Sequence, residues 1–136
     1  KVNIIGNLNI LESCRINKIK RYIYSSSVYA HSNSGSFYSC TKTASELYIN
    51  EYNKAYGLNF TILRYGSLYG PRSGPENGLW RIVNDALNTN QISYIGDKDA
   101  VREYIHVYDA AVASCEILDK KEFCSTSIKC GTKPSW

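Results

Sequence analysis

The sequence predicts an α/β fold in which a parallel sheet is covered by helices. Helical and strand-like patterns alternate along the 136 residues, which favours such a sheet. Each strand-like run is short, rich in β-formers and bounded by polar residues, as buried strands are. Hydrophobic residues make up 43% of the chain and charged residues 21%, which is enough for a buried core and argues against disorder.

The first half of the chain is predicted to hold two helices and two strands. Ile4, Leu8 and Leu11 recur at helical spacing. Ser36 is a candidate N-cap for the second helix, and Gly57 follows its end as a C-terminal glycine does. The expected elements are a helix over 3–16, a strand over 21–26, a helix over 37–56 and a strand over 58–65. The apolar face of the second helix is expected to consist of Ala44, Leu47, Tyr48, Tyr52 and Ala55.

The second half opens with a loop rich in glycine and proline, over 66–78. The elements expected after it are a helix over 79–89, strands over 92–97 and 102–107, and a helix capped by Asp109. The tail over 119–136 is left unassigned. Ligands of parallel sheets bind at the carboxyl ends of strands, so the loops after Ser26 and Tyr65 are the places to look for a site.

Composition excludes several classes of function. The net charge is +4, but the basic residues are scattered, so no nucleic-acid interface is expected. No apolar run approaches the roughly 20 residues that a membrane span needs. The five cysteines form no Cys-x-x-Cys, which disfavours zinc and disulfides and fits a reducing cytoplasm. With two unpaired histidines, no metal site is expected. The chain begins with Lys1, and we interpret it as an internal piece of a longer protein.

The segment "GSFYSCTKTASE" places Tyr38 four residues before Lys42 at the start of the predicted helix. Tyr94 and Lys98 have the same spacing, so spacing alone does not identify a site. Context separates the two pairs. Tyr94 and Lys98 span a strand and a turn, where the side chains should diverge, whereas positions i and i+4 of a helix share a face.

A lysine ammonium beside a tyrosine phenol stabilises the phenolate, and such a tyrosine can exchange a proton with an alcohol near neutral pH. Oxidation of a secondary alcohol by a nicotinamide requires this exchange. Ser26 or Ser27, at the end of the preceding strand, could hydrogen-bond the same alcohol oxygen. The alternative is a surface pair of Tyr38 and Lys42 next to a serine-rich turn.

Five segments together resemble the extended short-chain dehydrogenase/reductase family, in its NAD-dependent sugar-nucleotide epimerase/dehydratase branch. They are "NIIGNLNILES", "KRYIYSSS", "YSCTK", "LRYGSLYGPR" and "VREYIHVYDAA", and they occur in the family's order over about residues 1–118. The resemblance implies a Rossmann-like fold. Residues 1–66 would form the later half of the NAD(P)-binding domain, and 67–118 would begin the substrate-binding subdomain and return to the core.

The resemblance also implies roles for single residues. The catalytic residues would be Ser27, with Ser26 as the alternative, Tyr38 and Lys42. The cofactor-binding residues would be Asn3, Tyr38, Lys42, Tyr65 and Gly66, and the substrate-binding residues Ser67 and Arg102. His106 and Asp109 would be structural, as a packed histidine and a helix cap. No position resembles a metal ligand.

The function implied is epimerisation of a nucleotide-activated sugar with NAD, with NADP left open. Simple oxidation or reduction is an alternative. A non-catalytic remnant or interaction module is a second alternative, because no Gly-x-x-Gly-x-x-Gly turn for binding the cofactor's pyrophosphate occurs. For the same reason the chain alone is expected to be inactive. Family members often dimerise through the helices represented here by 3–16 and 37–56.

An epimerase or reductase is predicted in preference to a 4,6-dehydratase. Dehydratases resembling this chain carry an Asp-Glu pair directly after the catalytic Ser or Thr. Here Ser27 is followed by Val28 and Tyr29. The nearest carboxylate downstream is that of Glu46, which is expected to face away from the site.

Overall fold

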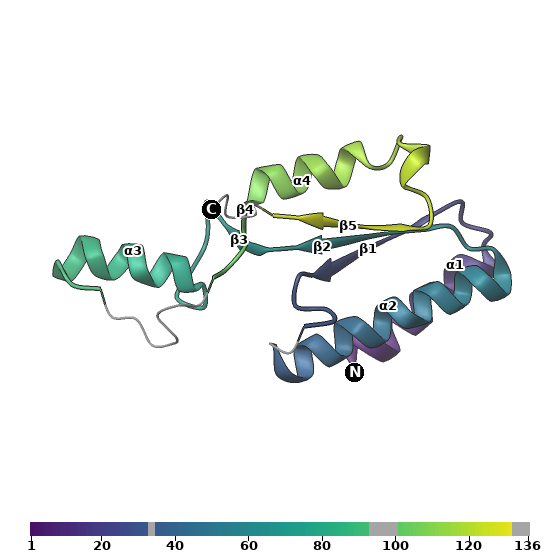
Figure 1. Cartoon of the computed structure of the whole chain (residues 1–136), viewed down its shortest axis with the longest axis horizontal. Coiled ribbons are helices and arrows are strands. Elements are labelled where there is room, and N and C mark those ends of the chain that lie inside the picture. The colour runs from purple at the N-terminus through teal and green to yellow at the C-terminus, as the bar shows by residue number, and fades with distance from the viewer. Residues whose placement is uncertain (33–34, 93–100, 132–136) are drawn as a thin grey trace.

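The computed structural model describes residues 1–32, 35–92 and 101–131. Its centre is a sheet of three strands in the order β1-β2-β5, formed by β1 (Tyr22–Ser27), β2 (Phe60–Tyr65) and β5 (Thr126–Cys130). Both strand pairs are parallel. Figure 1 shows α1 and α2 on one face of this sheet and α4 on the other. The predicted α/β fold with a helix-covered parallel sheet is confirmed.

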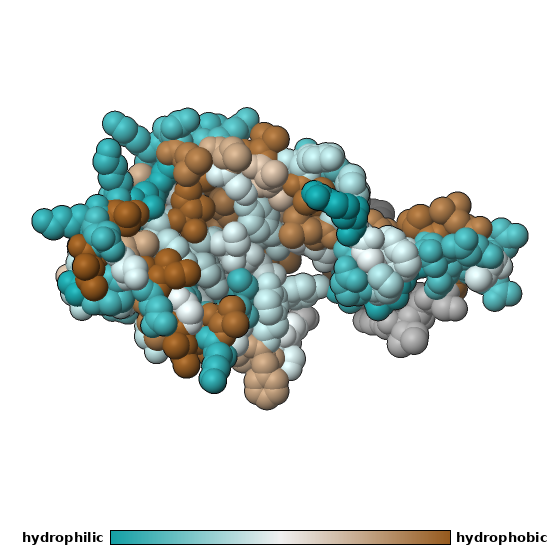
Figure 2. Space-filling view, turned by 180° about the vertical axis from the view of Figure 1, so that it is seen from behind, coloured by the Kyte–Doolittle hydropathy of each residue, from teal (hydrophilic) through white to brown (hydrophobic). Residues whose placement is uncertain are grey.

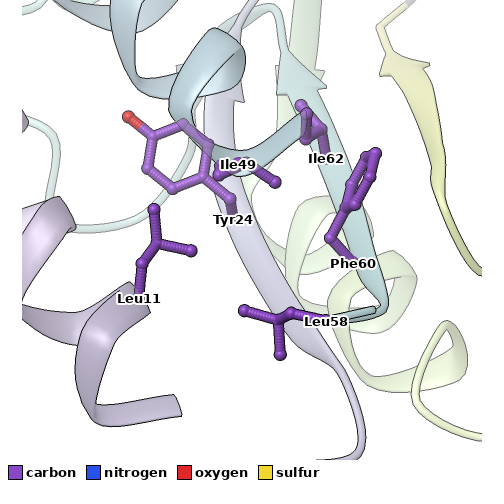
Figure 3. Packing of buried hydrophobic residues seen from close by; sticks show 6 residues of the cluster. All are labelled: Leu11, Tyr24, Ile49, Leu58, Phe60 and Ile62. Atoms are coloured by element: carbon purple, nitrogen blue, oxygen red, sulfur yellow. The ribbon is translucent and has the colours of Figure 1, made fainter. Parts of the chain in front are cut away.

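The core lies between the sheet and the first two helices. A π-helical segment (Val2–Gly6) leads into α1 (Asn7–Ile16), and α2 (Ser36–Tyr56) follows β1. Figure 3 shows the buried cluster, in which Leu11 and Ile49 from the helices meet side chains of the sheet. The members from the sheet and its edge are Tyr24, Leu58, Phe60 and Ile62. This packing holds α1 and α2 against the sheet.

The apolar face predicted for α2 is buried only in part. Tyr52 packs against the core cluster, as predicted, but most of the other residues of that face are exposed. Leu47 is 57% exposed and Tyr48 43% exposed, while the residues buried on α2 are Ser39, Ser45, Glu46 and Ile49. Three of these four are polar, and hydrogen bonds offset the cost of burying them. The Ser45 hydroxyl, for example, donates to the backbone oxygen of Asn3 at 2.6 Å. Periodicity of apolar residues therefore identified only part of the buried side of this helix.

The ends of α2 also differ in part from expectation. Its N-cap is Gly35, in the left-handed region with φ of 95°, and Ser36 lies inside the helix without capping it through its side chain. At the other end Gly57 takes a left-handed conformation with φ of 70°, as predicted. A glycine meets no Cβ penalty at either position.

The opposite face of the sheet is covered by α4 (Val107–Glu116). Arg21, just before β1, donates to the backbone oxygens of Ile117, Leu118 and Lys120 after the end of α4. A short 3₁₀ helix (Lys121–Phe123) then leads into β5. The tail that the sequence left unassigned thus contributes a strand to the sheet, with Leu63 opposite Ile128.

The remaining elements form a lobe beside the sheet. Its strands β3 (Ser67–Tyr69) and β4 (Tyr104–His106) pair in parallel, and α3 (Gly78–Thr89) extends away from the sheet (Figure 1). The lobe begins at Ser67, and the division into a cofactor-binding part over 1–66 and a substrate-binding subdomain from 67 stays a prediction. The strand predicted over 92–97 lies outside the described residues, apart from Ile92.

The expected cap of α4 was wrong. The ring Nδ1 of His106 accepts from the backbone N–H of Tyr108 at 3.3 Å, so His106 is the N-cap and Asp109 lies in the first turn. His106 also packs against the rings of Tyr69 and Tyr108, each 5.2 Å away between centroids. It is thus packed, as expected, and it also takes the role that was assigned to Asp109. No helix among the described residues has the length and apolar character to cross a bilayer.

Candidate active site

The N-terminal half of α2 presents Tyr38 and Lys42 on one face. The Lys42 ammonium lies 5.7 Å from the centroid of the Tyr38 ring and 4.8 Å from that of Tyr24. It donates to the backbone oxygen of Ser25 at 2.7 Å. The lysine is therefore anchored to β1 beside the tyrosine, and the helical spacing of the pair is realised in space.

Both side chains keep polar atoms available. Tyr38 is 46% exposed, and its phenol oxygen makes no hydrogen bond to any other residue that the structure describes. An ammonium has three N–H donors, and the Ser25 contact uses one of those of Lys42. The remaining donors suit ribose hydroxyls, and the free phenol suits proton exchange with an alcohol.

The three serines at the end of β1 have different surroundings. Ser26 is 5% exposed and donates to Glu46 Oε1 at 2.5 Å, and Ser27 is 6% exposed and accepts from the backbone N–H of Tyr29 at 3.2 Å. Ser25 is exposed, and its carbonyl oxygen contacts Lys42. No hydrogen bond within the described part of the chain joins Ser27 to Tyr38 or Lys42. Sequence analysis did not consider Ser25, although the alternation of side chains along a strand places it on the same face as Ser27.

Asn3 lies beside the helix that carries the pair. Its amide nitrogen donates to the Thr41 hydroxyl at 3.1 Å, and Thr41 immediately precedes Lys42. The structure thus brings together three of the residues expected at the cofactor, Asn3, Tyr38 and Lys42.

Tyr65 and Gly66 end β2 in another setting. The Tyr65 hydroxyl is hydrogen-bonded to Ser114 on α4, and burial raises the pKa of this phenol. The Gly66 N–H donates to the backbone oxygen of Cys130 at 2.8 Å. A Cβ at position 66 would lie 2.7 Å from the backbone oxygen of Glu103, so the close approach of these two segments requires glycine.

Ser67 and Arg102, the two residues expected to bind substrate, line one cavity of about 800 Å³ in the lobe. Arg81 and Glu76 also line it, together with residues at the start of α3. Two guanidinium groups in one cavity suit an anionic ligand, since arginine recognises phosphate and carboxylate oxygens by paired N–H donors.

Tyr29 connects this cavity to the candidate site. Its phenol oxygen accepts from Arg102 Nη1 at 2.6 Å. Its backbone oxygen accepts from the Ser39 hydroxyl at 2.7 Å, one residue after Tyr38. The loop after β1 therefore touches both the helix of Tyr38 and the arginine of the cavity.

The position of Glu46 differs from the expectation that its side chain would face away from the site. Its side chain is 2% exposed and lies against the strand of the candidate serines. Arg64 Nη2 donates to Oε2 at 2.5 Å, Arg64 Nε reaches both carboxylate oxygens, and His31 Nε2 lies 2.9 Å from Oε2. Burial alone would raise the pKa of Glu46, but hydrogen bonds from Arg64, Ser26 and His31 lower it below its ordinary value.

Within the described residues no group of three or more His, Cys, Asp or Glu side chains could hold a metal ion. The chemistry that this arrangement offers is proton exchange at Tyr38 and anion binding in the adjoining cavity.

The sequence of residues 1–131 matches the model of a family described as "NAD dependent epimerase/dehydratase family". A putative UDP-glucose 4-epimerase of Methanocaldococcus jannaschii is 34% identical over 137 residues, which cover 88% of this chain and 45% of the relative. A UDP-glucuronate 4-epimerase of Thermodesulfobacterium geofontis is 29% identical, covering 80% of this chain and 38% of the relative.

Solved structures agree with these matches. The crystal structure of a UDP-glucose 4-epimerase from Thermotoga maritima, with UDP-glucose, superposes with a TM-score of 0.82 and 28% identity, covering 96% of this chain and 47% of that one. A UDP-glucuronic acid 4-epimerase from Bacillus cereus, in complex with NAD, gives a TM-score of 0.85 at 25% identity and covers 96% of this chain and 47% of that one. This chain thus spans about half the length of these relatives, and it belongs to the NAD-dependent epimerase/dehydratase family.

Proposed function

We propose that this chain is part of an NAD-dependent enzyme that epimerises a nucleotide-activated sugar. The observation that carries the proposal is the pair of Tyr38 and Lys42, in which the ammonium is fixed to β1 and the phenol oxygen has no hydrogen bond to another described residue. Family membership gives this pair its chemical context, because relatives named as 4-epimerases cover nearly the whole chain.

In this proposal Tyr38 takes the proton of a secondary sugar hydroxyl and later returns it. Lys42 stabilises the phenolate and holds the ribose next to the nicotinamide, with the Asn3 side chain beside it. NAD, when bound, supplies the acceptor and donor of hydride, and return of hydride to the opposite face of the ketone inverts the carbon. NAD is favoured over NADP because related epimerase structures contain it.

A serine hydroxyl at the end of β1 would hold the sugar oxygen that reacts. Ser27 has this role in our proposal, and Ser26 is the alternative. Ser25 is the most exposed of the three serines, so it is tested as well. Alanine at each position separates them. We expect Ser27→Ala to lower kcat more than Ser26→Ala, and a larger loss for Ser25→Ala would move the role to Ser25.

The cavity of Ser67 and Arg102 would receive the nucleotide diphosphate. Its two arginines offer paired N–H donors to the oxygens of a diphosphate, while Glu76 in the same cavity offsets one of their positive charges. Tyr29 keeps Arg102 close to the helix of Tyr38. A UDP-hexose or a UDP-hexuronate is the substrate class that fits best, because these are the compounds named for the relatives.

Epimerisation is favoured over dehydration by the residues that follow each serine. Loss of water beside a 4-keto group needs an acid and a base next to the reacting sugar. Whichever of Ser25, Ser26 or Ser27 is used, the next two residues include no carboxylate. Glu46 does not replace them, because its carboxylate is buried and bound by Arg64.

The same proposal includes a homodimer in the cytoplasm. Exposed apolar side chains on the π-helical segment, α1 and α2 would lie in the contact between subunits, namely Ile5, Ile10, Leu47 and Tyr48. All five cysteines are unpaired, which fits a reducing compartment. Sedimentation of the intact protein tests the dimer, and Leu47→Lys should shift it to the monomer.

The deciding experiment is incubation of the intact protein that carries this chain with NAD and a panel of UDP-sugars. Interconversion of isomers at constant mass, lost in Tyr38→Phe, supports the proposal. Loss of one water from the product would indicate a dehydratase, and accumulation of a ketone with stoichiometric NADH would indicate a simple oxidoreductase. Recovery of every sugar unchanged would favour a non-catalytic protein.

A further inference from the structure

The side chain of Glu46 is the most completely buried charge among the described residues, and the proposed mechanism does not use it. It lies on α2 one helical turn after Lys42 and two turns after Tyr38. The five polar contacts of its carboxylate come from three other parts of the chain: Ser26 on β1, Arg64 on β2 and His31 in the loop after β1.

The position of these contacts matters more than their number. Ser26 pairs with Arg64 in the parallel register, so the two donors lie opposite each other at the carboxyl ends of β1 and β2. One carboxylate therefore binds both strands at the same level. Ser25, the neighbour of Ser26, holds the Lys42 ammonium through its backbone oxygen at 2.7 Å. Helix α2 thus contacts two adjacent residues of β1, because Glu46 binds the Ser26 hydroxyl and Lys42 binds the backbone oxygen of Ser25.

We propose that Glu46 and Arg64 are positioning residues that set the rotation and the depth of the Tyr38–Lys42 face against β1. This inference rests on the proposed function. If α2 turned or slid, Lys42 would lose Ser25, and Tyr38 would leave the position at which a sugar hydroxyl meets it. Apolar packing alone would hold α2 less specifically, because Ile49 is the only fully buried apolar side chain that α2 contributes among the described residues.

The geometry of the pair suits this role. Arg64 donates through both Nε and Nη2 to the two carboxylate oxygens, and such a fork restricts orientation as well as distance. Ser26 donates to the oxygen that also receives Arg64 Nε, and His31 meets the other one. Each carboxylate oxygen therefore has contacts from two separate segments, and a shift of α2 in either direction would lengthen at least one of them.

The test uses the intact protein with NAD and its UDP-sugar, and compares Glu46→Gln and Arg64→Gln with Ile49→Ala. Glutamine has nearly the shape of glutamate but presents an N–H₂ where Arg64 needs an acceptor. Ile49→Ala is the matched control, because Ile49 packs in the apolar cluster of the same helix and takes no part in the hydrogen bonds that Glu46 makes to Ser26 and Arg64. All kinetics are measured at a temperature at which each variant is folded by circular dichroism.

We expect Glu46→Gln and Arg64→Gln to lower kcat by about 10-fold to 100-fold with KM changed less than threefold, the size of effect that an ångström of misplacement produces. Glu46→Asp, which keeps the charge, should recover part of the loss, and Ile49→Ala should keep kcat within about threefold of the wild type. Equal losses in Glu46→Gln and Ile49→Ala, or no loss in Glu46→Gln, would overturn the proposal.

Amide hydrogen exchange supplies a second readout that does not depend on turnover. Glu46→Gln should accelerate exchange over 37–42 and 25–27, whereas Ile49→Ala should accelerate it beyond residue 46. If the wild type converts no UDP-sugar, the proposed function fails and exchange alone decides the positioning role. Unchanged exchange over 37–42 in Glu46→Gln would then overturn it.

Discussion

Helices α2 and α3 teach opposite lessons about how an apolar pattern relates to burial. In α3 the residues Leu79, Ile82, Val83, Ala86 and Leu87 fall on one face, as predicted, yet no residue of this helix is buried. In α2 most of the predicted apolar face is exposed, yet the helix is held firmly against the sheet. Figure 2 shows apolar surface exposed on the lobe that carries α3.

The difference lies in which partners each helix finds. Helix α2 packs on β1, β2 and α1, and polar side chains such as Ser45 and Glu46 find hydrogen-bond partners there. Helix α3 projects away from the sheet, and in the part of the chain that is described its apolar face is not covered. Periodicity therefore indicates which face could be buried, and tertiary contacts decide which face is.

The largest expected effect concerns the free phenol on α2. Tyr38→Phe in the intact protein should lower kcat by about 10²-fold to 10⁴-fold, because only the oxygen that carries the proton is removed. Cofactor binding, followed by calorimetry, should change little. A variant that keeps more than about a tenth of the wild-type kcat would show that α2 is not the catalytic helix.

The second effect contrasts a polar contact of α2 with an apolar residue of α3. Glu46→Ala should lower the free energy of unfolding by about 3–5 kcal/mol, because it leaves Arg64 partly buried without its partner. Leu87 is 79% exposed, so Leu87→Ala should change that free energy by less than about 0.5 kcal/mol. Urea denaturation of the two variants measures both, and equal effects would remove the contrast between the helices.

The dependence of stability on pH should separate the two helices in the same way. The folded-state pKa of Glu46 is lowered, so its contribution is complete above the ordinary value of 4.5 and is lost as the pH falls through the lowered folded-state pKa. Stability should fall on acidification in the wild type and in Leu87→Ala. The fall should be smaller in Glu46→Gln, measured by urea midpoints from about pH 6 to about pH 3, a range that begins above the ordinary value of 4.5 and extends below it. Parallel curves for all three proteins would contradict the role of the buried carboxylate.

The smallest effect on stability is expected for Leu87 of α3, and its size should depend on whether a longer polypeptide covers this face of the helix. In the 136-residue chain Leu87→Ala should be nearly neutral, because the side chain has little contact to lose. A longer polypeptide that covers this face would raise the cost toward the 2–5 kcal/mol typical of a buried leucine. Thermal unfolding of the variant in both lengths distinguishes the two, and a neutral substitution in both would show that the face stays in solvent.

Local sequence determined several features by itself. The alternation of helix and strand, the end of α2 at Gly57 and the shared face of Tyr38 and Lys42 all follow from residues within one or two turns of each other. These features depend on backbone preferences and on the fixed geometry of a helix, so distant parts of the chain hardly alter them.

Only tertiary structure decided the rest. The tail pairs with β2 as strand β5, His106 caps α4 in place of Asp109, and Glu46 turns inward to Arg64. Each of these outcomes depends on a partner distant in sequence or on a side-chain rotamer that packing selects. Strand pairing and the burial of a polar group gain their free energy from such partners, and the spacing of residues in one segment carries no record of them.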